Sequence, residues 1–155
     1  AKLGVVKGRN AEAFDPDAPI TRAEFATICA RFDKTQISTS SNFTDISGHW
    51  AEKYIERAAT LGWIAGYSDG TFRPSNYITR AEAMTMINRV LDRVPSEESH
   101  LLSRGVMQIW PDANPGDWFY LAMQEATNSH DFKRKGEVGE KWTKLTSAPD
   151  WSRYQ

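Results

Sequence analysis

The sequence predicts a mainly α-helical fold that is built from internal repeats. Residues 20–24, Ile-Thr-Arg-Ala-Glu, return unchanged as residues 78–82, which lie 58 positions later. Aligning residues 4–33 with residues 62–91 without a gap gives 11 identities in 30 positions. Apolar residues follow each copy at helical spacing. A single unit of a repeat protein usually cannot bury its own apolar face, so the copies are expected to pack together.

Both copies carry a capping box at the predicted start of a helix. Thr21 with Glu24, and Thr79 with Glu82, have the Thr-x-x-Glu spacing. In this motif the Thr side chain accepts the third backbone N–H, and the Glu reaches back to the N–H of the cap residue. The sequence therefore predicts helices near residues 21–32 and 79–92. Their apolar sides are Phe25, Ile28, Cys29 and Phe32 in the first, and Ala83, Met86, Ile87, Val90 and Leu91 in the second.

A further helix is predicted near residues 49–61, upstream of the second copy. Gly62 is placed to end it in a left-handed conformation. Residues 63–74 follow as a glycine-rich loop with a tight turn at Ser-Asp-Gly. The apolar side of the helix consists of Trp50, Tyr54, Ile55, Ala58 and Leu61. One unit thus consists of a helix, an ordered loop, a capping box and a second helix.

Helix capping leaves Arg22 and Arg80 unexplained. Both lie in the first helical turn, where the macrodipole disfavours a cation by roughly a few tenths of a kcal/mol. An anion-binding role would explain them, because the free N–H groups of a helix start and a forked guanidinium together bind a carboxylate or a phosphate. The alternative, in which each arginine pairs with a nearby acidic side chain, also fits the sequence.

A third, altered unit follows at the same spacing. Trp118 stands 29 residues before Ser147, as Trp50 stands before Thr79. The sequence therefore predicts a helix near 117–128 and a short helix after Ser147, where Ser147 and Asp150 keep the form of a capping box and Ala148 replaces the arginine. Applied to Thr21, the spacing places the first Trp before residue 1. We therefore expect the chain to begin inside its first repeat and to be a fragment of something longer.

Residues 43–51, 62–74 and 78–82 together resemble a complete S-layer homology (SLH) motif. The resemblance implies a pseudo-threefold SLH module, in which one helix from each motif forms a central three-helix bundle and the loops and short helices form prongs. Residues 1–33 would be a partial first motif, residues 43–92 a complete second motif and residues 107–155 a degenerate third motif. Together they would make one module.

The same resemblance implies a function at the bacterial cell wall. In that family the grooves between prongs bind secondary cell-wall polysaccharide, an acidic and typically pyruvylated glycan, and hold a surface protein there without a covalent bond. The alternative is a structural self-association module of a surface lattice, with self-association through the truncated first motif. The candidate glycan-binding residues are Arg22, Arg80, Lys7, Gly8, Trp63, Gly66, Tyr67, Ser68, Asp69 and Gly70.

Aromatic and cysteine residues add three expectations. Trp50 and Trp118 are expected in the core because of their helical positions. Aromatic residues in or beside loops are candidates to stack on a sugar ring: Trp63, Tyr67 and Tyr77. Cys29 is the one cysteine of the chain and lies on an apolar helix side, so a buried, inert thiol is expected.

Composition excludes several other functions. A formal net charge of −1 gives no general attraction to nucleic acid, and no apolar run approaches the ~18 residues of a membrane span. The three histidines, His49, His100 and His130, are scattered, and no zinc motif, phosphate loop or nucleophile elbow is present. We therefore expect no catalytic site, cofactor or metal in this chain. A catalytic domain could still lie in the absent N-terminal portion.

Overall fold

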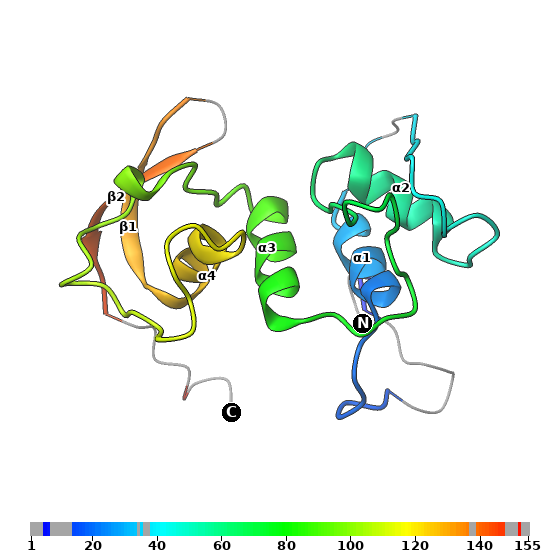
Figure 1. Cartoon of the computed structure of the whole chain (residues 1–155), viewed down its shortest axis with the longest axis horizontal. Coiled ribbons are helices and arrows are strands. Elements are labelled where there is room, and N and C mark those ends of the chain that lie inside the picture. The colour runs from blue at the N-terminus through cyan, green and yellow to red at the C-terminus, as the bar shows by residue number, and fades with distance from the viewer. Residues whose placement is uncertain are drawn as a thin grey trace. The chain divides into compact units, whose positions relative to one another are not determined.

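The mainly helical prediction is confirmed in the computed structural model, which describes residues 5–6, 14–33, 35, 38–136, 139–147 and 152. Across these residues it contains four α-helices and one two-stranded sheet (Figure 1). The chain divides into two compact units, Ala1–Met86 (unit 1) and Ile87–Gln155 (unit 2), and each is described by itself. In the described ranges, no helix has the length and apolar character needed to cross a membrane.

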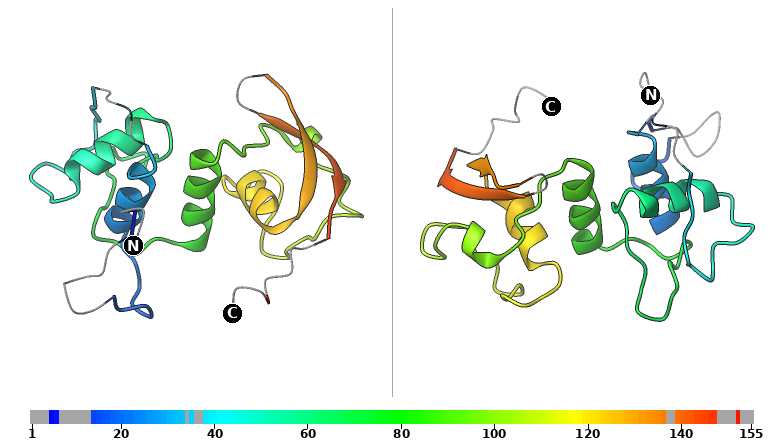
Figure 2. Two further views of the ribbon diagram at one scale, coloured as in Figure 1. Left: turned by 180° about the vertical axis from the view of Figure 1, so that it is seen from behind. Right: turned by 90° about the horizontal axis from the view of Figure 1, so that it is seen from above.

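Unit 1 is built around the packed helices α1 (Arg22–Ala30) and α2 (Glu52–Thr60), which lie side by side in Figures 1 and 2. Small residues on α1 allow a close approach between helices, and the larger Ile55 of α2 is fully buried. Helix α3 (Arg80–Val90) begins in unit 1 and crosses the boundary at Met86. The buried apolar residues of unit 1 are Ala23, Ala26, Cys29, Ala30, Ile46, Ala51, Ile55, Ala58, Ile64, Phe72 and Met86.

Helix α2 ends where the glycine predicts. Gly62 adopts φ +72° and donates its N–H to Ala59 O, while Trp63 donates to Ala58 O at 2.9 Å. This pair of hydrogen bonds is a Schellman motif, which satisfies two carbonyls at the helix end. The chain then enters the glycine-rich loop without leaving these carbonyls buried and unpaired.

That loop is held in shape by Asp45 and by a close backbone approach at Gly66. The carboxylate of Asp45 accepts the N–H groups of Phe72 and Arg73 at 2.8 and 2.7 Å. A Cβ on Gly66 would lie 2.4 Å from the Phe43 ring and 2.6 Å from Thr71 O, so only glycine fits there. The loop is therefore an ordered element of unit 1.

Unit 2 pairs α4 (Tyr120–Thr127) with a β-hairpin. Strands β1 (His130–Arg134) and β2 (Glu140–Leu145) run antiparallel, with an irregularity in register between Asp131 and Phe132 (Figure 2). A short 3-10 helix, η1 (Glu98–His100), precedes them. The buried apolar residues of unit 2 are Leu101, Met107, Ala113, Tyr120, Met123 and Trp142.

The predicted helices at 21–32, 49–61, 79–92 and 117–128 are all confirmed, and each is a few residues shorter than expected. The short helix predicted after Ser147 falls mainly on residues 148–151. These residues, which include Asp150, lie outside the described ranges. The hairpin was not predicted; each of its strands has one aromatic residue between polar ones, Phe132 in β1 and Trp142 in β2, and these two residues pair.

The core assignment of two tryptophans is wrong. Trp50 and Trp118 are 60% and 67% exposed. Both precede the first turn of their helices, α2 and α4, so their side chains do not continue the buried stripe of the helix. The prediction for Cys29 is confirmed, because its thiol is free and buried, and burial raises its pKa to about 11.

Candidate functional site

The starts of α1 and α3 carry the same five residues but are used differently. At α1, Arg22 N–H donates to Asn76 O at 2.8 Å and Ala23 N–H donates to Pro74 O at 3.0 Å. The capping box between Thr21 and Glu24 satisfies the next donor. The N-terminal N–H groups of α1 are therefore occupied by the segment that leads into α3.

The side chain of Arg22 is also occupied by the protein itself. It is 3% exposed, and its Nη1 lies 2.5 Å from Glu82 Oε1. Its Nε donates to Phe72 O at 2.8 Å, and its guanidinium carbon lies 4.8 and 4.6 Å from the ring centroids of Tyr67 and Phe72. Pairing with an acidic side chain, the alternative left open by the sequence, thus describes Arg22 in this structure. No ligand can reach this guanidinium unless the pair with Glu82 opens.

Glu82 is the second anchor of this arrangement. Its Oε1 also accepts the hydroxyl of Tyr67 at 2.7 Å, and its Oε2 accepts Thr79 N–H at 2.9 Å. Burial acts to raise the pKa of Glu82, but the hydrogen bonds from Thr79 and Tyr67 and the charge of Arg22 outweigh it and lower that pKa. Glu82 is therefore held ionised, as its partners require.

The start of α3 is free. Thr79 and Glu82 form the capping box, with Glu82 N–H donating to Thr79 Oγ1 at 3.3 Å. Arg80 is exposed. Within the described residues, neither its guanidinium nor the N–H groups of Arg80 and Ala81 make a hydrogen bond or ion pair. A cation and two backbone donors are thus available together, which is the arrangement that binds an anion at a helix start.

The glycine-rich loop satisfies much of its own hydrogen bonding. Tyr67 N–H donates to Thr71 O, and Gly70 N–H donates to Tyr67 O. Asp69 accepts Thr71 Oγ1 at 2.6 Å and pairs with Arg73 at 2.9 Å, and these partners lower its pKa to about 2. Of the predicted loop residues, Ser68 and Asp69 are exposed. The loop is preorganised, and Tyr67 connects it to Glu82.

Other predicted residues lie elsewhere or outside the description. Lys7 and Gly8 fall in residues 7–13, which the structure does not describe. Trp63 is half-buried, whereas Tyr77 is 65% exposed and pairs with Thr21 through an isolated antiparallel bridge. Tyr67 lies between Arg22 and Arg73, whose guanidinium carbons are 4.8 and 3.9 Å from its ring centroid. Its ring faces are therefore covered by cations.

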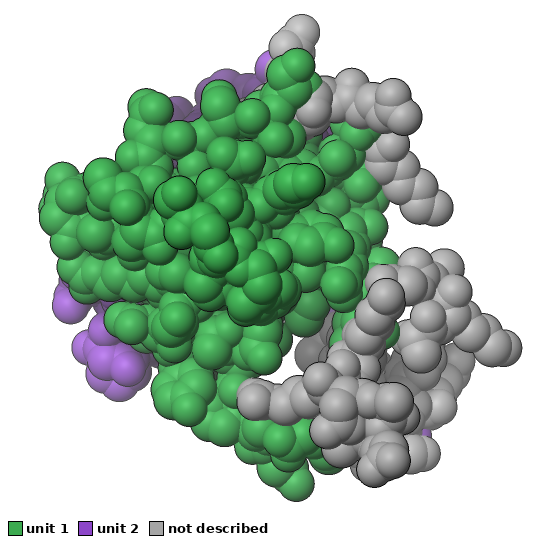
Figure 3. Space-filling model, turned by 90° about the vertical axis from the view of Figure 1, so that its right-hand side faces the viewer, with its two compact units in different colours: residues 1–86 green, residues 87–155 purple. Residues whose placement is uncertain are grey.

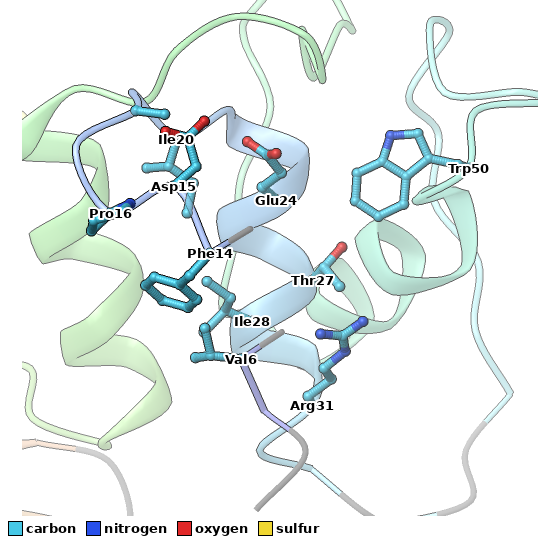
Figure 4. A pocket seen from close by; sticks show the side chains of 11 residues that line it. Val6, Phe14, Asp15, Pro16, Ile20, Glu24, Thr27, Ile28, Arg31 and Trp50 are labelled. Carbon is cyan, nitrogen blue, oxygen red and sulfur yellow. The ribbon is translucent and has the colours of Figure 1, made fainter. Parts of the chain in front are cut away.

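An open pocket of about 720 Å³ lies in unit 1 along α1. Unit 1 is shown as a space-filling model in Figure 3, and the pocket from close by in Figure 4. Trp50 lies on one side of α1, and Phe14 and Val6 lie on the other side (Figure 4). The lining residues are Val6, Phe14, Asp15, Pro16, Ala18, Ile20, Glu24, Thr27, Ile28, Arg31 and Trp50.

The sequence does not point to this pocket. Its helical position predicts Trp50 in the core, and no motif marks Arg31 as a site residue. A weak signal is nevertheless present, because Trp50 directly follows Ser47, Gly48 and His49, residues typical of a turn before a helix. An exposed indole beside polar side chains is suited to the apolar face of a sugar ring, since it offers a large flat surface without a competing charge.

Unit 2 holds a second group of ionisable side chains that the sequence did not reveal. Glu125, His130 and Glu140 bring one ligand-type atom each within 4.8 Å of one another. Arg93 and the indole of Trp142 already bind both carboxylates, so we assign no metal to this group. Its members come from three different elements, which is why sequence spacing could not identify it.

Comparison with known proteins decides the family. The model of the S-layer homology domain matches residues 1–26 and 42–84, which include both copies of the repeated pentapeptide. The chain belongs to the S-layer homology family. As an SLH chain it is a non-catalytic module, and its family places it at the bacterial cell surface as an anchor.

Relatives of this SLH chain are large surface proteins. It is 38% identical over 154 residues to "Cell surface glycoprotein 1" of Acetivibrio thermocellus, covering 92% of this chain and 6% of that protein. It is 40% identical over 126 residues to the "Cellulosome-anchoring protein" of the same organism, covering 77% of this chain and 27% of that protein. The "Middle cell wall protein" of Brevibacillus brevis is 33% identical over 117 residues, with 72% and 10% covered. The chain thus spans a small part of the relatives it matches.

Proposed function

We propose that this chain anchors its protein by binding an acidic secondary cell-wall polysaccharide, and that a carboxylate of the polymer sits at the start of α3. One observation supports this most directly. The two identical helix starts differ, because Arg22 is buried against Glu82 whereas Arg80 is exposed beside two backbone N–H groups that no described residue accepts. In this proposal Arg22 acts through the fold, and Arg80 contacts the ligand.

The chemistry at α3 suits a carboxylate such as that of a pyruvate ketal. A guanidinium presents parallel N–H donors that match the two oxygens of a carboxylate, and the N–H groups of Arg80 and Ala81 add donors along the helix axis. The macrodipole strengthens each of these contacts with an anion. Glu82 carries a negative charge in the same turn, but its two oxygens are bound by Arg22, Tyr67 and Thr79.

The pocket beside Trp50 is the candidate site for the sugar rings of the polymer. It combines an exposed indole with the polar side chains of Thr27 and Arg31. Arg31 is held in place by a hydrogen bond to Val5 O at 3.1 Å and by the ring of Tyr54, 5.4 Å from its guanidinium carbon. Apolar faces and hydroxyl groups of a neutral sugar are the two kinds of surface that such a lining binds.

Calorimetric titration of an acidic wall oligosaccharide tests the proposal. Hydrogen bonds to charged groups contribute roughly 1.5–3 kcal/mol, so Arg80→Ala should weaken binding by roughly ten- to a hundredfold. Arg80→Lys should recover only part of this loss, because an ammonium lacks the planar fork. Arg104→Ala, which removes an exposed arginine of unit 2, is the matched control. Circular dichroism should be the same for all variants.

A lattice function would give the opposite pattern. If the repeats serve contacts between copies of this chain, Arg80→Ala would change the mass measured by light scattering and leave glycan affinity at the parental value. Capture by purified cell walls separates the two functions further, because chemical removal of the secondary polymer should abolish glycan-dependent binding. Parental affinity of Arg80→Ala for the oligosaccharide would disprove the carboxylate seat at α3.

A further inference from the structure

Unit 2 contains a buried cluster of charged residues that glycan binding does not use. It joins Arg93, which follows α3, to Glu125 of α4, His130 of β1 and Glu140 of β2. The side chains of Glu125, His130 and Glu140 are 4%, 2% and 0% exposed. Buried charges are costly unless they are paired, so the number of protons in this cluster matters for the stability of the unit.

Hydrogen bonding fixes one proton of His130. Its Nδ1 lies 2.6 Å from Asn128 O, and because a carbonyl can only accept, Nδ1 carries a hydrogen. Its Nε2 lies 3.2 Å from Glu125 Oε2 and 3.1 Å from Glu140 Oε1. Without a proton, Nε2 could accept a hydrogen bond from Arg93 Nη2 at 3.0 Å, but its lone pair would also face two carboxylate oxygens. With a proton, it is a charge-assisted donor to both.

Charge balance also calls for the second proton. Arg93 supplies one positive charge, with Nε 2.7 Å from Glu140 Oε2 and Nη2 2.8 Å from Glu125 Oε1. Trp142 adds a neutral N–H, 3.1 and 3.2 Å from the two carboxylates, and its ring stacks on His130 at 3.8 Å between centroids. Two carboxylates therefore face one guanidinium, and an imidazolium makes the cluster neutral.

The cluster is also the polar connection between α4 and the hairpin. In the described part of unit 2, every hydrogen bond and ion pair between α4 and the two strands ends on Glu125. The other polar contacts of the hairpin with the rest of the unit lie outside α4; Arg134, for example, pairs with Asp92 at 3.1 Å on the exposed side. Loss of the contacts to Glu125 would thus remove the polar connection between α4 and the hairpin in the described part of unit 2.

We propose that His130 is a pH-dependent latch. The doubly protonated imidazole holds Glu125 of α4 and Glu140 of β2 together, and loss of its Nε2 proton releases the hairpin from α4. The charged groups that face the ring are Glu125, Glu140 and Arg93, with Arg93 Nη2 at 3.0 Å from Nε2. Deprotonation leaves the two carboxylates facing the single positive charge of Arg93 and the neutral N–H of Trp142.

The direction of the switch follows from the surroundings of the ring. Burial acts to lower the pKa of His130, but hydrogen bonds with Glu125, Asn128 and Glu140 outweigh it, so the pKa is raised above the ordinary histidine value. The latch is therefore closed below the raised pKa of His130 and opens as the pH rises through that pKa. Burial likewise raises the pKa of Glu125, so that carboxylate is the first of the pair to take a proton in acid.

Nuclear magnetic resonance of the 155-residue chain tests the latch. With a chelator present, the imidazole nitrogens of His130 should both be protonated at about pH 6, with a titration midpoint above about 6.5. The indole N–H resonance of Trp142, assigned with Trp142→Phe, should move with the same midpoint. Above it, amides of the hairpin should exchange about tenfold faster relative to amides of α2, a ratio that cancels the intrinsic pH dependence of exchange.

Two variants complete the experiment. His130→Gln cannot titrate and should abolish the alkaline step, whereas His49→Gln, in unit 1, should leave it intact. An unprotonated Nε2 at about pH 6 with a native Trp142 resonance would overturn the proposal. An alkaline step that persists in His130→Gln would overturn it as well. If His130→Gln does not fold, the nitrogen spectrum of the unmodified chain still decides.

Discussion

Arg22 and Glu82 come from the same pentapeptide in two different copies, and they form a largely buried ion pair of 2.5 Å across 60 residues of sequence. The arginine of the first copy pairs with the glutamate of the second. Since Glu82 also closes the capping box of α3 and accepts the hydroxyl of Tyr67, one carboxylate joins α1, the glycine-rich loop and α3. The two copies of the pentapeptide thus hold α1, the glycine-rich loop and the start of α3 together in unit 1.

Removing Arg22 should destabilise the chain strongly. Breaking a buried ion pair by deleting one partner costs roughly 3–5 kcal/mol, because the other charge stays buried and unpaired. Arg22→Ala also leaves the carbonyls of Phe72 and Ala65 without their donor. Chemical denaturation followed by circular dichroism measures this. The exposed Arg80→Ala is the control and should stay within about 0.5 kcal/mol of the parent. Equal stability of the two variants would contradict the structural role of Arg22.

The Glu82 ion pair should make unit 1 sensitive to acid. A carboxylate whose folded pKa is lowered stabilises the fold above its unfolded pKa and loses that contribution as the pH falls through the lowered folded value. Thermal unfolding between neutral pH and strong acid should therefore show a fall in melting temperature below about pH 4.5. Glu82→Gln should flatten this fall. Asp112→Asn, at an exposed turn of unit 2, should reproduce the parental profile.

Gly66 should tolerate no side chain. In Gly66→Ala the new methyl group would meet the Phe43 ring and Thr71 O at 2.4 and 2.6 Å, and overpacking of this kind costs roughly 1–3 kcal/mol. Gly105→Ala is the matched control, because a Cβ at that position would have nothing within 4 Å. Denaturant midpoints of the two variants give the comparison. A parental midpoint for Gly66→Ala would mean that the loop relaxes freely.

Trp50 should contribute to glycan affinity and little to stability. Covering about 60 Å² of indole by a sugar ring contributes about 1.5 kcal/mol, so Trp50→Ala should weaken binding about tenfold. Trp118→Ala removes a similarly exposed indole from unit 2 and serves as the control. Titration with a neutral wall oligosaccharide isolates this contribution from that of Arg80. Unchanged affinity of Trp50→Ala would exclude the pocket as the site for the sugar rings.

The helices could be predicted because their starts are encoded locally. Thr21 and Glu24 fix the start of α1 within four consecutive residues, and Gly62 ends α2 through its own left-handed backbone. These effects depend only on neighbouring residues in the sequence. A repeated pentapeptide therefore begins a helix in both places. The hairpin has no such local signal, because its register depends on the pairing of Phe132 with Trp142.

The site could be predicted only in part. Arg22 and Arg80 have identical neighbours in sequence and opposite surroundings, since residues 74–76 cover one helix start and not the other. Helical periodicity likewise could not place Trp50, because it does not say where a helix begins. Glu125, His130 and Glu140 come from three elements that only the folded chain brings together.

The coverage of the α1 start by Pro74 and Asn76 has a consequence for stoichiometry. Counting pentapeptides would assign two acidic groups of the wall polymer to residues 1–86. In the first copy, however, the backbone N–H groups of the helix start already donate to the segment that leads into the second copy. Unit 1 should therefore bind a single acidic group per chain at saturation. If a titration gave two bound acidic groups per chain, the second would have to bind at a site other than Arg22.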